Sequence, residues 1–201
     1  MIGKTLSQGN RVGKDAIYIT LPKCANTSIK ERILEKTNNP RMTFRELRKE
    51  KNNKFIFTFV RNPYDRIMSL YKDKILNKNV GKNKIKKNKL DKLGKNIQEI
   101  PSLSFKDFVD LICIIPDKFS DYHFESMTSI LNRNKVKCNF IGKVENINED
   151  WRKISMLLNL TKNLSQRNKT QKEKKKYYTK ELKEKVYQRY KEDFINFNYE
   201  K

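Results

Sequence analysis

Three short runs of β-forming apolar residues, each followed by a segment with helical spacing, constrain the fold of this chain most strongly. The runs occupy residues 16–21, 54–60 and 138–144. Strands that alternate with helices in this way are typical of α/β proteins with a parallel sheet. The chain has 201 residues, which is enough for one domain with a substantial core. We therefore predict an α/β fold over residues 1–201, a single domain with a parallel β-sheet flanked by helices.

Capping residues and apolar stripes indicate where the helices lie. Helices are expected at about 28–36, at 43–51, from Pro63, after a Ser104 cap, after residue 148 and from a Thr179 cap. Several apolar residues of the last two helices are expected to face the core: Trp151, Ile154, Leu157, Leu158, Leu182, Val186, Tyr190 and Phe194. Residues 1–14 are polar and contain Gly, which predicts a loose lead-in.

Residues 77–98 form a tract rich in Lys and Asn with little periodicity. Such a composition predicts a flexible, solvated insertion. A mobile basic lid near an acceptor site is the functional alternative. Because charge runs are usually solvated, we predict a flexible insertion.

The loop between the first expected strand and the following helix combines a cation with hydroxyl groups. Pro22 ends the strand, and residues 22–28 run Pro-Lys-Cys-Ala-Asn-Thr-Ser. A helix N-terminus offers backbone N–H groups and the positive end of its dipole to an anion. Lys23, Thr27 and Ser28 add a charge and two hydrogen-bond donors. The loop therefore has the chemistry of a phosphate or sulfate cradle, with an ordinary strand–turn–helix as the alternative.

The second expected strand ends at a basic residue, Arg61. Asn62 and Pro63 then suit the N-cap and the first position of a helix, and Ser69 lies about two turns further on. Open α/β sheets bind ligands at the carboxyl ends of their strands. A guanidinium fork and a hydroxyl at this edge can hold a second phosphate group.

These stretches resemble the donor-binding motifs of sulfotransferases that use 3′-phosphoadenosine 5′-phosphosulfate (PAPS). Residues 22–28 are similar to the 5′-phosphosulfate loop, and residues 61–69 to the 3′-phosphate motif. Residues 140–151 resemble a third block of the carbohydrate branch (Golgi-type, sulfotransferase family 2) and its bacterial relatives. The resemblance implies a P-loop-like sulfotransferase fold, PAPS as co-substrate and a carbohydrate hydroxyl as acceptor. Two features differ from the family pattern. The loop has Ala25 and Asn26 where many members carry Gly, and we expect no N-terminal membrane anchor like that of the Golgi enzymes.

The same resemblance implies roles for individual residues. Lys23 is expected to be catalytic, because charge shifts onto the bridging oxygen of the leaving phosphate and a cation there stabilises it. The residues expected to bind the donor are Lys23, Cys24, Ala25, Asn26, Thr27, Ser28, Arg61, Ser69, Arg167 and Lys169. The last two fall where the family often brings a late basic loop over the 3′-phosphate.

A hydroxyl acceptor also needs a general base, and His123 is the only histidine of the chain. Its Asp-Tyr-His-Phe setting resembles the histidine position that follows the 3′-phosphate motif in the carbohydrate branch. Some members use Glu instead, so Glu31, Asp121 and Glu125 are rival candidates. A structural histidine is the remaining alternative.

Cysteine usage and hydropathy suggest a compartment. The three cysteines, Cys24, Cys113 and Cys138, are widely spaced and odd in number, which predicts free thiols. Neither they nor the single histidine have metal-ligand spacing, so no metal is expected. No apolar run has the length of a membrane span, and residues 1–14 lack the core of a signal peptide. We therefore expect a cytoplasmic protein.

A net charge of +23 attracts polyanions, although Lys and Asn are abundant throughout the chain. A basic polyanion- or nucleic-acid-binding protein is therefore one alternative, without a recognised nucleic-acid motif to support it. A nucleotide or small-molecule kinase is another, but the chain lacks a Walker A loop and a clear acidic Mg²⁺ site. The expected partners remain a donor nucleotide and a hydroxyl-bearing acceptor, with a saccharide favoured and no specific nucleic acid.

Overall fold

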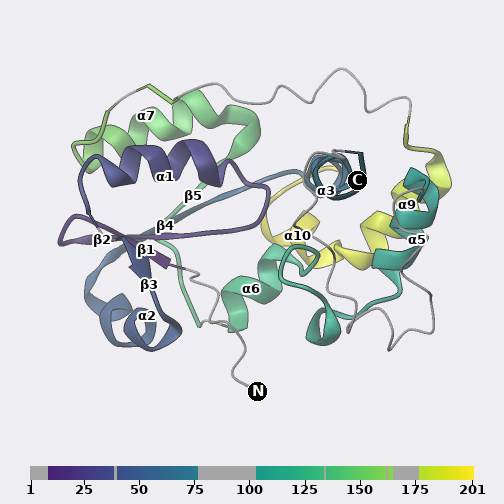
Figure 1. Cartoon of the computed structure of the whole chain (residues 1–201), viewed down its shortest axis with the longest axis horizontal. Helices are drawn as coiled ribbons and strands as arrows, with labels where there is room; N and C mark the ends of the chain where they lie inside the picture. The colour runs from purple at the N-terminus through teal and green to yellow at the C-terminus, as the bar shows by residue number, and fades with distance from the viewer. Residues whose placement is uncertain (1–8, 39, 77–102, 134, 162, 165–176) are drawn as a thin grey trace. The chain divides into compact units, whose positions relative to one another are not determined.

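The computed structural model describes residues 9–38, 40–76, 103–133, 135–161, 163–164 and 177–201 (Figure 1). These residues form two compact units. The first unit takes its residues from 1–62 and 125–169, and the second from 63–124 and 170–201. The predicted insertion at 77–98 lies outside the described residues.

A five-stranded sheet forms the centre of the first unit, with the strand order β3-β1-β2-β4-β5. The strands are β1 (Gly9–Val12), β2 (Ala16–Ile19), β3 (Arg41–Met42), β4 (Phe55–Val60) and β5 (Phe140–Lys143). β2, β4 and β5 run parallel, with Tyr18 opposite Phe57 and Phe57 opposite Phe140. These are the three strands expected from the sequence, so the α/β prediction is confirmed.

Part of the predicted lead-in is instead a strand. β1 pairs antiparallel with both β2 and β3. Its Asn10 is buried, and the side-chain amide donates to Thr20 Oγ1 at 3.1 Å. The expectation for residues 9–12 was wrong because Gly-Asn-Arg-Val carries no apolar alternation, and the strand forms through backbone pairing with its neighbours.

Two helices pack on one face of the sheet and a third lies on the other (Figure 1). They are α1 (Asn26–Leu34) and α7 (Ile147–Leu157) on the first face, and α2 (Phe44–Glu50) on the second. The buried cluster on the first face contains Tyr18, Ile29, Ile33, Phe57, Phe59, Trp151 and Ile154. Burial of this apolar surface stabilises the sheet by roughly 25 cal/mol per Å². Leu157 was expected in this core but is 62% exposed, because it lies at the end of α7.

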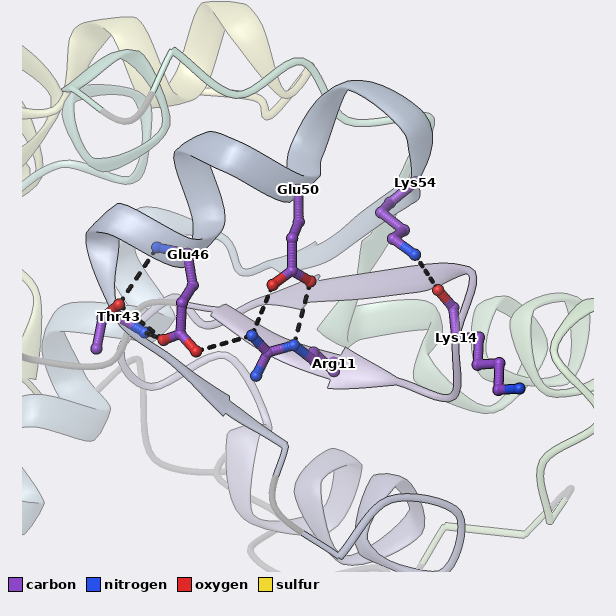
Figure 2. Close-up of polar contacts among 6 residues, drawn as sticks. All are labelled: Arg11, Lys14, Thr43, Glu46, Glu50 and Lys54. Carbon is purple, nitrogen blue, oxygen red and sulfur yellow. Dashed lines mark hydrogen bonds and ion pairs between the residues drawn. The ribbon is translucent and has the colours of Figure 1, made fainter.

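An ion-pair network joins β1 to α2 (Figure 2). The Arg11 guanidinium lies 2.6 Å from Glu50 Oε1 and 2.8 Å from Glu46 Oε1. Glu46 also accepts from the backbone N–H of Thr43 at 2.7 Å, and Thr43 Oγ1 accepts in return from Glu46 N–H at 3.2 Å. This capping box starts α2 and fixes one carboxylate for Arg11. Figure 2 also shows Lys54 bound to the carbonyl of Lys14.

The described part of the second unit is helical. Its elements are α3 (Pro63–Tyr71), a π-helical turn (Lys72–Leu76), α5 (Phe105–Cys113), a 3-10 turn (Asp117–Phe119), α9 (Lys180–Arg189) and α10 (Lys191–Asn196). Ser104 and Thr179 cap α5 and α9 as predicted. The predicted stripe of the last helix is buried in the core of this unit, although the helix divides at Tyr190.

The remaining elements of the first unit are α6 (Met127–Arg133) and two 3-10 turns (Lys51–Asn53 and Val144–Asn146). No helix within the described ranges is long and apolar enough to cross a bilayer.

Candidate functional site

The cradle loop follows β2 and leads directly into α1. Lys23 has φ 65° and Ala25 has φ 57°, so two residues of this short loop adopt the left-handed conformation. Ala25 is the N-cap of α1, and its carbonyl accepts from Ile29 N–H at 3.2 Å. The helix therefore starts at Asn26, two residues earlier than expected, and Thr27 and Ser28 lie in its first turn. That turn contains no acidic residue that would repel an anion.

Asn26 holds the loop closed. Its Nδ2 donates to the Leu21 carbonyl at 2.7 Å, and its Oδ1 accepts from the Tyr18 hydroxyl at 2.5 Å. The side chain therefore bridges the end of β2 and the start of α1. Ala25 and Asn26 thus preserve a tight turn without glycine, through a left-handed backbone at one residue and a side-chain bridge at the next.

The other residues of the cradle face different surroundings. Cys24 is fully buried, with its thiol 3.7 Å from the sulfur of Met127. The Cys24 backbone N–H donates to the Leu21 carbonyl at 3.3 Å, so Cys24 helps to close the loop. Thr27 is exposed, Lys23 is half-buried and Ser28 is 8% exposed. Ammonium and hydroxyl groups near a helix N-terminus can bind an oxyanion.

The two basic motifs meet in the first unit. Arg61 directly follows β4, and its Nη1 donates to the carbonyl of Lys23 at 3.4 Å. The neighbouring backbone N–H of Asn62 donates to Glu145 Oε1 at 2.8 Å. Glu145 follows β5, so the parallel pairing of β4 and β5 brings these residues to one edge of the sheet. The carboxyl ends of β2, β4 and β5 thus gather residues from all three motifs, as expected for an open α/β sheet.

Two further predicted residues, Ser69 and His123, belong to the second unit. Ser69 is half-buried in α3. The backbone N–H of His123 donates to Asp121 Oδ1 at 3.0 Å, and its Nδ1 lies 2.7 Å from the same oxygen. The carbonyl of His123 accepts from Nη2 of Arg66 at 3.2 Å. Arg61 and Lys23 are thus brought together in one unit, whereas Ser69 and His123 are described in the other.

A family comparison matches residues 14–200 to the model of the sulfotransferase family, the branch suggested by the three motifs. The chain belongs to the sulfotransferase family. The match runs through residues of both units. Membership supports a sulfotransferase activity and implies a nucleotide that donates the sulfuryl group. No match was found among curated proteins or among solved structures.

Within this sulfotransferase, two rival bases have other partners. Glu125 is buried, and its carboxylate lies 2.8 Å from Arg133 Nη1 and 2.9 Å from Ser129 Oγ. Removing one partner of a buried pair leaves an unpaired buried charge, which costs several kcal/mol in general. Asp121 is bound to His123. The third rival, Glu31, is half-buried in α1.

The remaining candidate residues lie in the second unit or outside the described residues. Arg167 and Lys169 lie beyond the described residues. Tyr177 and Tyr178 pack against the core of the second unit, and the Tyr178 hydroxyl donates to the Tyr64 carbonyl at 2.9 Å. Among the described residues, no group of three metal-ligating side chains was found. The three cysteines are free, and burial raises the pKa of Cys113 to about 11 and that of Cys138 to about 12.

Sequence reasoning missed the supporting residues of this site. Tyr18 was assigned only to a strand, yet its hydroxyl anchors Asn26. A tyrosine in a buried strand needs a hydrogen-bond partner for its hydroxyl, and this requirement was the available signal. Arg66 was also missed, and a fully buried arginine in a helix similarly requires acceptors nearby.

Proposed function

We propose that this sulfotransferase moves the sulfuryl group from PAPS to a hydroxyl group of a carbohydrate. The observation that carries the proposal is the hydrogen bond from Arg61 to the Lys23 carbonyl beside the N-terminus of α1. It puts two cationic residues and a helix dipole at one edge of the sheet. A nucleotide with phosphate groups at both its 5′ and 3′ positions matches such a distribution of charge.

In the proposed reaction, the acceptor oxygen attacks sulfur as the bond from sulfur to the bridging phosphate oxygen breaks. The leaving 3′-phosphoadenosine 5′-phosphate takes the electron pair. Lys23 stabilises the charge on the bridging oxygen, while Thr27, Ser28 and the backbone N–H groups of α1 bind the equatorial oxygens. His123 accepts the proton of the acceptor hydroxyl.

The 3′-phosphate is assigned to Arg61 and Ser69 on the spacing of their motif. Arg167 and Lys169 are proposed as further contacts on the sequence resemblance. Ala25 and Asn26 are proposed to contribute through the backbone of the cradle, and Cys24 is included on the sequence resemblance. A cytoplasmic location remains a prediction, and the three free cysteines fit a reducing compartment.

Calorimetric titration with 3′-phosphoadenosine 5′-phosphate tests the donor assignment, with 5′-AMP and ATP as comparison ligands. We expect binding that requires the 3′-phosphate and that weakens strongly in Arg61→Ala. Arg48→Ala, at an exposed position of α2, removes the same charge elsewhere and is expected to bind normally. Equal binding or no binding of all three nucleotides would overturn the donor assignment and favour a general polyanion-binding protein.

The acceptor class is tested by transfer of radiolabelled sulfate from PAPS to a panel of oligosaccharides and phenols. We expect label on saccharide hydroxyls. Label on phenols alone would contradict the carbohydrate assignment while leaving the donor assignment intact.

A further inference from the structure

The segment that carries His123 is fixed on several sides within the second unit. Phe124 N–H donates to the Asp121 carbonyl at 2.8 Å, which closes a tight turn around the histidine. The Phe124 carbonyl accepts from the buried Tyr190 hydroxyl at 2.8 Å. Arg66, which is 0% exposed, donates to the His123 carbonyl. A histidine on such a backbone is held in place more firmly than one on an unsupported loop.

The imidazole itself is bound through one nitrogen. Nδ1 lies 2.7 Å from Asp121 Oδ1, and the same oxygen accepts the backbone N–H of His123 at 3.0 Å. An ionised carboxylate only accepts hydrogen bonds, so Nδ1 must carry the proton of this bond. In the neutral ring the other nitrogen, Nε2, then has the free electron pair. Among the described residues, none forms a hydrogen bond with Nε2, and the side chain is 40% exposed.

We infer that Asp121 is a positioning residue that holds His123 in the Nδ1–H tautomer, with Nε2 as the atom that accepts the proton of the acceptor hydroxyl. This inference rests on the proposed function. The hydroxyl oxygen bonds to sulfur, the phosphate oxygen of the donor leaves with its electron pair, and the hydroxyl proton moves to Nε2. The Asp121 carboxylate stabilises the resulting imidazolium, which passes its proton to solvent. Asp121 is therefore a partner of the base and not a competing base.

A spectroscopic test does not depend on catalysis. Because His123 is the only histidine, the two-bond ¹H–¹⁵N spectrum of ¹⁵N-labelled protein contains signals from a single imidazole. Spectra are recorded at rising pH until the two nitrogen shifts stop changing, so that the ring is neutral and the shifts report the tautomer. We expect Nδ1–H in the native chain. In Asp121→Ala we expect the tautomer ratio to move to that of N-acetylhistidine amide measured alongside.

The variant Asp121→Asn removes the negative charge of the side chain but keeps the hydrogen-bonded turn. Its amide oxygen can still accept the backbone N–H and the Nδ1–H of His123, so the fold of the segment is retained. The loss of the negative charge weakens the bond to Nδ1–H and removes the stabilisation of the imidazolium. Asp117→Asn makes the same change at a carboxylate that pairs with Arg189 and is the matched control. We expect the native tautomer in the control and a reduced Nδ1–H population in Asp121→Asn.

The kinetic arm measures sulfuryl transfer from PAPS in the same variants. General bases contribute about 100–10,000-fold to rates, so we expect kcat to fall by about 100-fold or more in Asp121→Asn with donor KM unchanged. An Nε2–H tautomer in the native chain, or a tautomer unchanged in Asp121→Ala, would overturn the inference. An altered tautomer with unchanged kcat would also overturn it. Failure of the native chain to bind 3′-phosphoadenosine 5′-phosphate would reject the proposed function, while the spectra would still decide the tautomer.

Discussion

Arg61 donates a hydrogen bond from Nη1 to the backbone carbonyl of Lys23, at 3.4 Å. The two residues come from separate motifs, one after β4 and one after β2, and the parallel pairing of these strands brings them together. Because Arg61 presents a planar fork with five donors, it can bind this carbonyl and still offer N–H groups to a phosphate. The guanidinium geometry, and not only its charge, therefore matters at this position.

This relationship predicts a graded response to substitution of Arg61. Arg61→Lys keeps the charge but loses the fork, so affinity for 3′-phosphoadenosine 5′-phosphate should fall between those of the native chain and Arg61→Ala. Charge-assisted hydrogen bonds contribute about 1.5–3 kcal/mol, so the loss in Arg61→Ala should be about 10- to 100-fold. Calorimetry measures all three constants. Equal affinities for Arg61→Lys and the native chain would show that charge alone suffices.

Replacement of Lys23 by glycine should abolish most activity without disturbing the loop. Lys23 has φ 65°, a conformation that glycine adopts readily, so Lys23→Gly removes the ammonium while it favours the native backbone. Loss of one preorganised transition-state donor typically lowers the rate about 100–1,000-fold. Single-turnover transfer from PAPS measures the effect, with Lys191→Ala at an exposed site of α10 as control. A loss of only a few-fold would exclude Lys23 from the catalytic role.

Ala25→Gly should stabilise the first unit. A left-handed conformation costs a non-glycine residue roughly 1–2 kcal/mol, and the added freedom of glycine in the unfolded chain costs about 0.4–1 kcal/mol. Ala25 has φ 57°, so the net gain should be about 0.5–1 kcal/mol, measured by urea unfolding. Ala16→Gly makes the same change inside β2 and should destabilise. A loss of stability in Ala25→Gly would mean that the methyl group has a packing role there.

Gly142→Ala should destabilise the sheet through a steric clash. A Cβ at Gly142 would lie 2.5 Å from the nearest ring carbon of Phe59. Overpacking of this kind typically costs about 1–3 kcal/mol. Because the smaller side chain of Phe59→Leu makes room, the double variant should be more stable than the sum of the single changes predicts. Additive losses in urea unfolding would contradict this explanation.

Removal of the Glu46 carboxylate should have a pH-dependent effect on stability. The hydrogen bond from Arg11, followed by those from Thr43, lowers the pKa of Glu46 from 4.5 to about 2. A carboxyl group with a lowered folded-state pKa stabilises the fold above its unfolded pKa, and this contribution disappears as the pH falls toward the folded value. The difference in unfolding free energy between the native chain and Glu46→Gln should therefore be constant above about pH 5 and shrink between about pH 4.5 and 2.

The Arg11→Met background provides the control for this dependence. Because the Arg11 hydrogen bond is the largest cause of the shift, Glu46→Gln in that background should lose most of its pH dependence. If the effect of Glu46→Gln on the unfolding free energy still depends on pH in the Arg11→Met background, the lowered pKa of Glu46 is due to Thr43 instead.

Local sequence was sufficient for the central strands and for the caps of α5 and α9. Runs such as 54–60 predict strands because they combine β-propensity with burial, and Ser104 and Thr179 start helices because their hydroxyls accept nearby backbone N–H groups. The motifs around Lys23 and Arg61 were recognisable because each lies in one continuous stretch. Family membership was likewise predictable from the order of these stretches.

The pairing of distant residues depended on tertiary structure. β1 forms because its backbone pairs with β2 and β3, and no apolar pattern within Gly9–Val12 could show this. Propensity, capping and motif spacing are local properties, so the parallel α/β core and the chemical character of the cradle could be predicted from the sequence. The folded structure was needed to show that Tyr18 anchors Asn26, that Arg61 binds the Lys23 carbonyl and that Arg66 supports His123. Those contacts join residues that are separated in the sequence, and strand pairing and helix packing determine which of them come into contact.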